Sequence, residues 1–479
     1  MLSTLTPVET RSVHPGCCCP AFLTEIDILN IYLSGLREGV SMPSLLSIRD
    51  SYQVAESLAR ADLMTSPAAR RRLQARRIEL GLGEHPGFVP PKHLLLYLVR
   101  MGSFSSSPKI MNEDTQDNDM SLPEDMTKED LLRYCSSQLQ GASVLNRRFR
   151  SVPDYHDATY KHHDLPHVKD PSSIRILQWN LLSQSLTGVS GPVQLPLIFL
   201  MGAVISLGVN NDNFVCCPPE ALQWQRRRNL LTQEIVRYSP DVICLQEVDH
   251  FNYLKKVLAT QGYVGMFFPK PDSPCMYVKD NNGPDGCAIF FRTSRFELVK
   301  HASRVLEVWK VQSNQVALLA ILRNRADGKE ICIATTHLKA RNGALLAALR
   351  NEQGKDLLDF VAAAAQDRPV ILCGDFNAEP IEPIYTSVTT HPSIRLASAY
   401  ATSEGEPPYT TWKVREEGEV RHTIDYIFYS KNKFQVEDVL EFPTGEEMGP
   451  GRVPSFNYPS DHFSLVSDLH LNHNVLSPL

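Results

Sequence analysis

The sequence predicts an α/β protein, a two-sheet α/β sandwich in which two packed β-sheets are flanked by helices. Apolar segments of strand length recur at many points between residues 174 and 469, and amphipathic segments of helical length stand among them in mixed order. The chain also has the material for a large core, because 43% of its 479 residues are hydrophobic and only 21% are charged.

Three regions differ in composition along the chain. Residues 1–120 are expected to be a variable, poorly ordered N-terminal region and linker, because their last part is polar and acidic. Residues 121–170 are expected to form a helical lead-in, and residues 171–479 the main domain. An atypical apolar insertion interrupts that domain near residues 188–210, where residues 195–209 are almost unbroken in their hydrophobicity. A membrane-spanning helix needs about 20 apolar residues, so no transmembrane segment is expected.

Periodicity and helix-boundary signals place the elements in chain order. In the lead-in, Thr127 stands three residues before Asp130, which is typical of a helix N-cap with an acidic first turn, and this helix should continue to about Gln140. Pro219 suits the first turn of a second helix, at residues 219–238. Further helices are expected at residues 249–260 and 343–365. Strands are expected at residues 174–179, 241–246, 288–292, 316–322, 331–336, 370–373, 424–429 and 463–469.

Charge and cysteine content narrow the class of protein. A net charge of −6 argues against broad nucleic-acid binding by the whole surface, although it leaves room for a local basic pocket. The eleven cysteines show neither a CxxC pair nor a zinc-finger spacing. Cys244, Cys332 and Cys373 fall inside apolar strand segments, and we interpret them as reduced core residues of an intracellular protein.

Polar side chains with acid–base or metal-binding chemistry stand at the ends of the predicted strands. They are Asn180, Glu247, Asp375, Asn377, Asp425 and the adjacent pair Asp461-His462. Because strand ends gather at one edge of a sheet, we expect these groups to converge there. A histidine beside a carboxylate can shuttle a proton or stabilise an anion near neutral pH. Each motif alone is more often structural than functional, but the full ordered set is specific.

The residue types favour a magnesium-dependent reaction at a phosphate. Mg²⁺ prefers oxygen ligands and takes only one or two carboxylates beside water and substrate phosphate, a role that Asn180 and Glu247 fit. Asp375 and Asn377 lie two residues apart, so an extended segment would present both on one side, toward an attacking water and a phosphoryl oxygen. His462 would then stabilise the anionic transition state.

The ordered motifs QWN, LQEVD, NNGPDG, THLKA, CGDFNAEP, HTIDYI and SDH resemble those of the exonuclease–endonuclease–phosphatase superfamily. The resemblance covers residues 120–475 apart from the insertion. It implies the two-sheet α/β sandwich of that superfamily. Longer runs such as PSFNYPSDH resemble one branch of it, and imply a Mg²⁺-dependent phosphatase that removes the 2′-phosphate of NADP⁺ and NADPH to give NAD⁺ and NADH. Two alternatives stay open: a poly(A)-specific 3′-exoribonuclease acting on mRNA tails, and a binding protein without catalysis.

The same resemblance implies roles for individual residues. Glu247 would bind the metal with Asn180 close by. The residues expected to orient water, contact the phosphate or assist the transition state are Asp375, Asn377, His462, Asp425 and His337.

Substrate contacts are expected from Asn180 and from the basic residues Lys270, Lys339, Arg341 and Arg415. If the segment after His337 stays extended, Lys339 and Arg341 would point to the same side as His337. A deadenylase would benefit from an extended basic groove with stacking aromatics, whereas a dinucleotide needs a few point contacts to phosphates. The few candidate basic residues and the acidic net charge favour the dinucleotide.

Other features are less decisive. Phe267, Phe268 and Trp412 could stack on adenine, but core packing explains each equally well. A monomer is expected. The protein is expected in the cytoplasm, in mitochondria or in both. The resemblance makes a mitochondrial location typical, although Glu9 and Asp27 make this N-terminus unlike an acidic-poor transit peptide.

Overall fold

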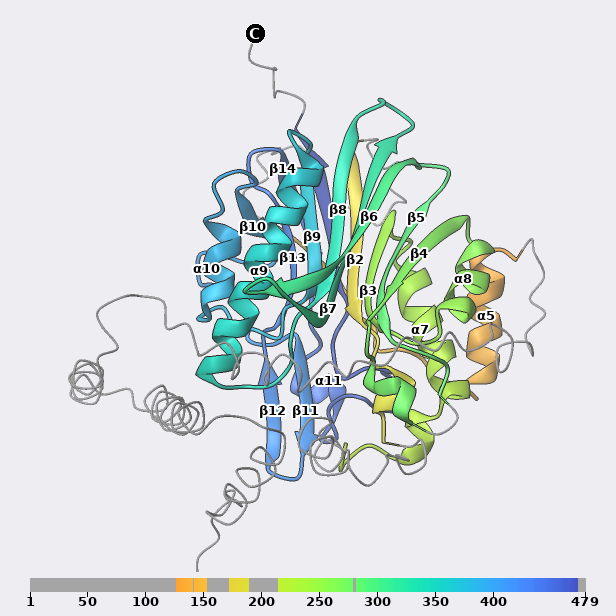
Figure 1. The fold of residues 1–479 in the computed structure, drawn as a ribbon. Helices are drawn as coiled ribbons and strands as arrows, with labels where there is room; N and C mark the ends of the chain where they lie inside the picture. Colours follow the sequence, from red (N-terminus) through yellow and green to blue (C-terminus); the bar gives the residue numbers. More distant parts are fainter. Residues whose placement is uncertain (1–125, 141, 153–171, 189–213, 279–280, 473–479) are drawn as a thin grey trace, which may run out of the picture. The chain divides into compact units, whose positions relative to one another are not determined.

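A computed structural model describes residues 126–140, 142–152, 172–188, 214–278 and 281–472 of the chain (Figure 1). These residues all belong to one compact unit. The expected N-terminal region, residues 1–120, lies outside the described residues, and so does the insertion at residues 188–210 apart from Gly188. The three-region division of the chain therefore stays a prediction.

Two mixed β-sheets form the centre of the fold. The first has seven strands in the order β1 (Phe149–Ser151), β14 (Phe434–Leu440), β15 (Leu465–Leu471), β2 (Ser173–Asn180), β3 (Val242–Val248), β5 (Gly286–Arg292) and β4 (Tyr263–Pro269). The second has six strands in the order β10 (Leu396–Ser398), β13 (Asp425–Ser430), β9 (Val370–Asp375), β8 (Glu330–His337), β7 (Val311–Asn324) and β6 (Phe296–Val308). A separate hairpin is formed by β11 (Thr411–Arg415) and β12 (Gly418–His422).

Helices cover the outer faces of the two sheets. Those packed on the seven-stranded sheet are α5 (Lys128–Gln138), α7 (Trp224–Arg237) and α8 (Phe251–Ala259). Those packed on the six-stranded sheet are α9 (Ala344–Ala365) and α10 (Pro383–Thr389). Figure 1 shows the two helix groups on opposite sides of the sandwich. Shorter helical turns lie at η1 (Gln184–Leu186), η2 (Pro219–Leu222), η3 (Pro274–Tyr277) and α11 (Gly445–Met448).

The alternation of side chains along the central strands explains this layering. On β3, Val242 and Cys244 enter the core between the sheets, whereas Ile243 and Leu245 pack against the helices outside. A strand buried on both faces can be continuously apolar, which is why these segments are easy to recognise in the sequence. The predicted two-sheet α/β sandwich is confirmed.

Several local predictions are confirmed, and one is wrong. Thr127 caps α5, its hydroxyl accepting from the backbone N–H of Asp130. Cys244, Cys332 and Cys373 are buried free thiols. The single helix expected at residues 219–238 is instead the 3₁₀ turn η2 followed by α7, because the backbone between them is extended at Gln223.

Among the described residues, no helix is both long enough and apolar enough to cross a bilayer.

Candidate active site

Strand register brings the predicted site residues together at one edge of the sandwich. In the seven-stranded sheet, β2 and β3 run parallel, so Asn180 and Glu247 leave the sheet at the same edge. In the six-stranded sheet, β8 and β9 run parallel with His337 opposite Asp375. Antiparallel β13 then places Asp425 opposite Asp375 on the other side. Three polar residues from three strands are thus neighbours by register alone.

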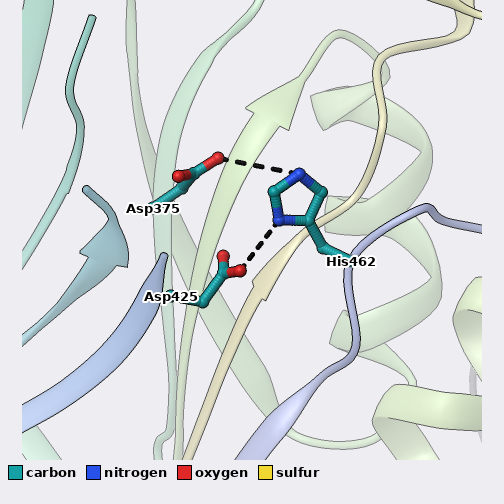
Figure 2. A group of neighbouring side chains, drawn as sticks. All are labelled: Asp375, Asp425 and His462. Atoms are coloured by element: carbon teal, nitrogen blue, oxygen red, sulfur yellow. Dashed lines mark hydrogen bonds and ion pairs between the residues drawn. The ribbon is translucent and has the colours of Figure 1, made fainter. Parts of the chain in front are cut away.

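His462 joins this edge from the loop that precedes β15, and it connects the two aspartates (Figure 2). Its Nδ1 lies 2.9 Å from Asp425 Oδ2, and its Nε2 lies 3.8 Å from Asp375 Oδ2. All three side chains are almost fully buried. Burial by itself would lower the pKa of His462, but Asp425, Asp461 and Asp375 raise that pKa to about 10. The imidazole is therefore a cation held among carboxylates.

Asn180 bridges the two sheets. Its Nδ2 donates to Glu247 Oε1 at 3.1 Å and to Asp375 Oδ2 at 2.9 Å. Its Oδ1 accepts from the backbone N–H of Leu182 at 3.0 Å, and Ser183 donates its backbone N–H to Glu247 Oε2 at 3.0 Å. The convergence predicted for Asn180, Glu247, Asp375, Asp425 and His462 is observed.

The electrostatics of this centre suit a hard divalent cation. Burial raises the pKa of Glu247, and Asp285 and Asp461 raise it further against the opposing effect of Lys270. Burial and the neighbouring Asp425 likewise raise the pKa of Asp375, to about 7. A nearby cation stabilises the ionised form of carboxylates whose pKa is raised in this way, and carboxylate and amide oxygens are suitable ligands for a divalent cation.

A second arrangement for a metal is the triad Asp375, Asp425 and His462, whose ligand atoms lie within 4.8 Å of one another. However, His462 Nδ1 is already committed to Asp425, and this imidazole is cationic rather than neutral. The pair Glu247 and Asn180 therefore fits a divalent metal better, and Asp425 fits the role of orienting His462.

Asn377 is placed differently from the prediction. Its φ of 49° lies in the left-handed region, so the segment after Asp375 is not extended and the two side chains do not simply share one side. Its backbone N–H donates to Asp375 Oδ1 at 2.8 Å, and its Nδ2 donates to the Leu338 carbonyl at 3.1 Å. Asn377 therefore contacts Asp375 with its backbone N–H and not with its side chain.

His337 and Lys270 form a second pair beside Asp375. His337 Nε2 lies 3.6 Å from Asp375 Oδ2, and its Nδ1 lies 3.4 Å from Lys270 Nζ. Burial, with Lys270, His462 and Lys339, keeps the pKa of His337 well below its usual range, so this imidazole is neutral.

Lys270 has a buried counterion that the sequence did not reveal. Its ammonium lies 2.6 Å from Asp285 Oδ2, and Asp285, in the NNGPDG motif, also accepts from the Ser273 hydroxyl. Burial acts to lower the pKa of Lys270, and Asp285 and Glu247 raise it above its usual range. The NNGPDG segment leads into β5, and its Asp285 holds this lysine.

The segment after His337 does not stay extended, so the predicted same-side arrangement of Lys339 and Arg341 fails. The strand ends at His337, and Arg341 has a φ of 87° and is exposed. Lys339 is half-buried. Burial, with Arg341 and Lys270, lowers its pKa to about 8. Arg350 donates to the carbonyls of both residues and so determines the course of this loop.

Arg415 contacts Asp461 and not the central cluster of Asp375, Asp425 and His462. One of its nitrogens is 4.0 Å from Asp461 Oδ2, and its guanidinium covers the ring of Phe214 at 4.6 Å. Lys413, which the sequence analysis missed, also donates to Asp461. Lys413 and Arg415 are two residues apart on β11, so they point to the same side of the strand. This period-2 spacing was the sequence signal that could have identified Lys413.

The aromatic candidates for adenine stacking are engaged within the protein. Phe267 stacks on Phe251 at 5.1 Å, and Phe268 packs against the core between the sheets. The Trp412 ring is flanked by the Arg452 guanidinium, at 4.5 Å, and by Tyr409. Core packing is the better interpretation of all three.

Comparison with known proteins agrees with this geometry. Residues 177–462 match the model of the Endonuclease/Exonuclease/phosphatase family. The chain is 46% identical to nocturnin of Drosophila melanogaster over 88% of its own length and 72% of that protein. The chain belongs to the nocturnin family.

Other relatives place the nocturnin family among hydrolases. The human nocturnin catalytic domain, solved with a bound sulfate anion, superposes with a TM-score of 0.52 at 38% identity, covering 68% of this chain and 98% of that domain. The Ccr4 3′-5′-exoribonuclease subunit of Candida albicans is 27% identical over 54% of this chain and 39% of its own. As a nocturnin-family member with this site, the chain is a hydrolase of the nuclease and phosphatase type.

Proposed function

We propose that this chain is a Mg²⁺-dependent phosphatase that removes the 2′-phosphate of NADP⁺ and NADPH. The observation that carries the proposal is a group of cations around His337. Lys270 Nζ lies 3.4 Å from His337 Nδ1, and burial, with Arg341 and Lys270, lowers the pKa of Lys339 to about 8. Mutually repelling cations of this kind are stabilised by an anion, and a terminal phosphate monoester carries about twice the charge of an RNA phosphodiester.

The site residues divide the work of an in-line displacement. Asp375 accepts a proton from the attacking water, and its raised pKa suits a general base near neutral pH. The water oxygen bonds to phosphorus as the bond from phosphorus to the ribose 2′-oxygen breaks, and that oxygen takes up a proton from solvent to leave as a hydroxyl. Inorganic phosphate and NAD⁺ or NADH are the products.

Charge on the transferring phosphoryl group is balanced by fixed groups. The His462 imidazolium, held by Asp425, faces the reacting edge with Nε2, and the neutral His337 can donate a hydrogen bond there. Glu247 and Asn180 would hold Mg²⁺, which when bound neutralises phosphoryl charge and polarises the phosphorus–oxygen bonds.

A second candidate is the poly(A) 3′-exoribonuclease, favoured by the similarity to the Ccr4 exoribonuclease subunit. The carboxylate and histidine cluster would serve that phosphodiester as well. What it would also need is a row of stacking aromatics, whereas the three aromatic side chains considered for that role contact other protein groups. The third alternative, a binding protein without catalysis, does not need buried acid–base groups in contact.

Metal removal tests the proposal directly. Purified full-length protein should release inorganic phosphate from NADPH with Mg²⁺, lose this activity with excess EDTA and regain it when Mg²⁺ is restored, because Glu247 and Asn180 hold the ion that neutralises the phosphate. An oligoadenylate assayed in parallel should keep its length. Shortening of the oligoadenylate without phosphate release from NADPH would transfer the assignment to the exoribonuclease.

Lys339 should impose an alkaline limit on substrate capture. Below about pH 8 its ammonium is charged and attracts the 2′-phosphate, and above that pH it loses the proton, so kcat/KM should fall as pH rises through this range. Lys339→Arg keeps the charge and should move the limit to higher pH. Lys339→Gln should raise KM at pH 7 about tenfold, the usual size of one charge-assisted contact. An unchanged alkaline limit in Lys339→Arg would show that another group sets it.

A further inference from the structure

Arg227 is a wholly buried cation that lies beside the site without reaching the reacting groups. It projects from the first turn of α7, and none of its surface is exposed. Its Nε donates to the Pro459 carbonyl and its Nη1 to Gln184 Oε1, both at 2.7 Å. Its Nη2 donates to the carbonyls of Leu181, at 2.6 Å, and Leu182.

The four acceptors belong to two loops that carry site residues. The first, which we call the asparagine loop, is residues 181–188 and follows Asn180 at the end of β2. The second, which we call the histidine loop, is residues 457–464 and contains Asp461 and His462. One guanidinium therefore holds two segments that are about 270 residues apart in sequence.

The asparagine loop in turn orients both proposed metal ligands. The backbone N–H of Leu182 donates to Asn180 Oδ1, and that of Ser183 donates to Glu247 Oε2, each at 3.0 Å. Leu182 has a φ of 57°, which is costly for a leucine and persists only where the surroundings impose it. Arg227 binds the carbonyl of Leu182 and that of the residue before it, so it is one of the groups that impose this conformation.

The charge of Arg227 is balanced at a distance rather than by contact. All four of its acceptors are neutral carbonyl or amide oxygens. Burial lowers its pKa to about 10, and Asp249, Asp461 and Glu247 oppose that shift. The guanidinium thus remains charged at neutral pH and is electrostatically linked to the carboxylates of the site.

We propose that Arg227 is a positioning residue that keeps Asn180 and Glu247 in register with His462 by clasping the asparagine loop and the histidine loop together. Its effect on catalysis rests on the function proposed above, but its effect on the two loops does not. Lysine cannot replace it, because an ammonium is a point donor, whereas a planar guanidinium offers five N–H groups in a fixed fork that can reach acceptors on two segments.

The test compares Arg227→Lys with the wild type, both as full-length protein with Mg²⁺. NADPH phosphatase activity is measured per folded molecule. Misplacing reacting groups by about 1 Å costs roughly 100-fold, so kcat should fall about 10- to 100-fold, while KM should change less than about threefold because the phosphate contacts remain. Hydrogen exchange read by mass spectrometry should speed up in residues 181–188 and 457–464 together, and stay unchanged in β8 and β9.

Two further variants keep the test decisive. Gln184→Met removes one acceptor and spares the arginine, and it should give a smaller loss of kcat, about three- to tenfold, and faster exchange in the asparagine loop. Arg175→Lys is the matched control, because Arg175 also donates to a backbone carbonyl, that of Tyr238, but stands at the opposite end of β2 from Asn180. It should leave kcat per folded molecule unchanged.

The outcomes separate this inference from the proposed function. If the wild type releases no phosphate from NADPH and Arg227→Lys still speeds up exchange in both loops, the positioning role of Arg227 is supported and the proposed substrate is wrong. If the wild type is active, a kcat in Arg227→Lys within twofold of wild type would contradict the positioning role of Arg227. Faster exchange that is spread over the whole chain or confined to one loop would also contradict this role. So would a loss of kcat in Arg175→Lys equal to that in Arg227→Lys.

Discussion

Asp375→Asn should lower kcat for phosphate release from NADPH by about 10²- to 10⁴-fold, the range typical of a lost general base. The carboxylate is in contact with Asn180, the backbone of Asn377 and two histidines, so the substitution removes the proton acceptor at the centre of the cluster. The amide keeps the size of the side chain, so KM should change much less than kcat.

The measurement is a steady-state assay at saturating Mg²⁺, with Asp356→Asn as control. Asp356 lies on α9 and is paired with Arg304 of β6, away from the site strands, so its neutral variant should retain wild-type kcat. A loss of less than about tenfold in Asp375→Asn, short of the usual range, would contradict the role of Asp375 as base.

Arg147→Met should destabilise the protein by about 3–5 kcal/mol, the usual cost of removing one partner of a buried ion pair. Arg147 and Glu234 are fully buried, with Nη1 3.1 Å from Oε1. Arg147 also donates to the hydroxyl and carbonyl of Ser464, and Tyr458 donates to Glu234. Without the guanidinium, Glu234 is a buried carboxylate that has lost its counterion, and burying an unpaired charge is costly.

A paired substitution distinguishes the lost ion pair from lost packing. Replacing both partners, as in Arg147→Met with Glu234→Leu, removes the unpaired charge and should recover most of the free energy of unfolding. Urea denaturation of full-length protein, followed by fluorescence, gives the comparison. Equal destabilisation of the single and the double variant would mean that the stability lost at this position comes from packing and not from the unpaired charge.

The layered core was predictable because its strands are buried on both faces. A strand such as β3 begins with an apolar run, Val242–Leu245, and the polar Gln246 and Glu247 follow near its end. Strands with one exposed face were missed, among them β6 and the hairpin of β11 and β12, because polar residues alternate along them and lower their hydrophobicity.

The site was predictable in its residue types but not in its local geometry. Five groups at strand ends do converge, since strand register decides their neighbours. The turns beyond the strands were not predictable, because the left-handed backbone at Asn377 and Arg341 depends on tertiary contacts rather than on glycine. Long-range partners were also hidden, as Asp285 for Lys270 and Arg227 for the two loops, because only the fold brings them together.

The destination of solvent oxygen tests the central claim, that the strand-end cluster directs water onto a phosphate monoester. NADPH is incubated with the full-length protein and Mg²⁺ in ¹⁸O-labelled water, and both products are examined by mass spectrometry. The account predicts one ¹⁸O atom in the released phosphate and unlabelled NADH, because water attacks phosphorus and the bond from phosphorus to the 2′-oxygen breaks. Label in the dinucleotide, or a product in which the 2′-phosphate is still attached, would contradict it.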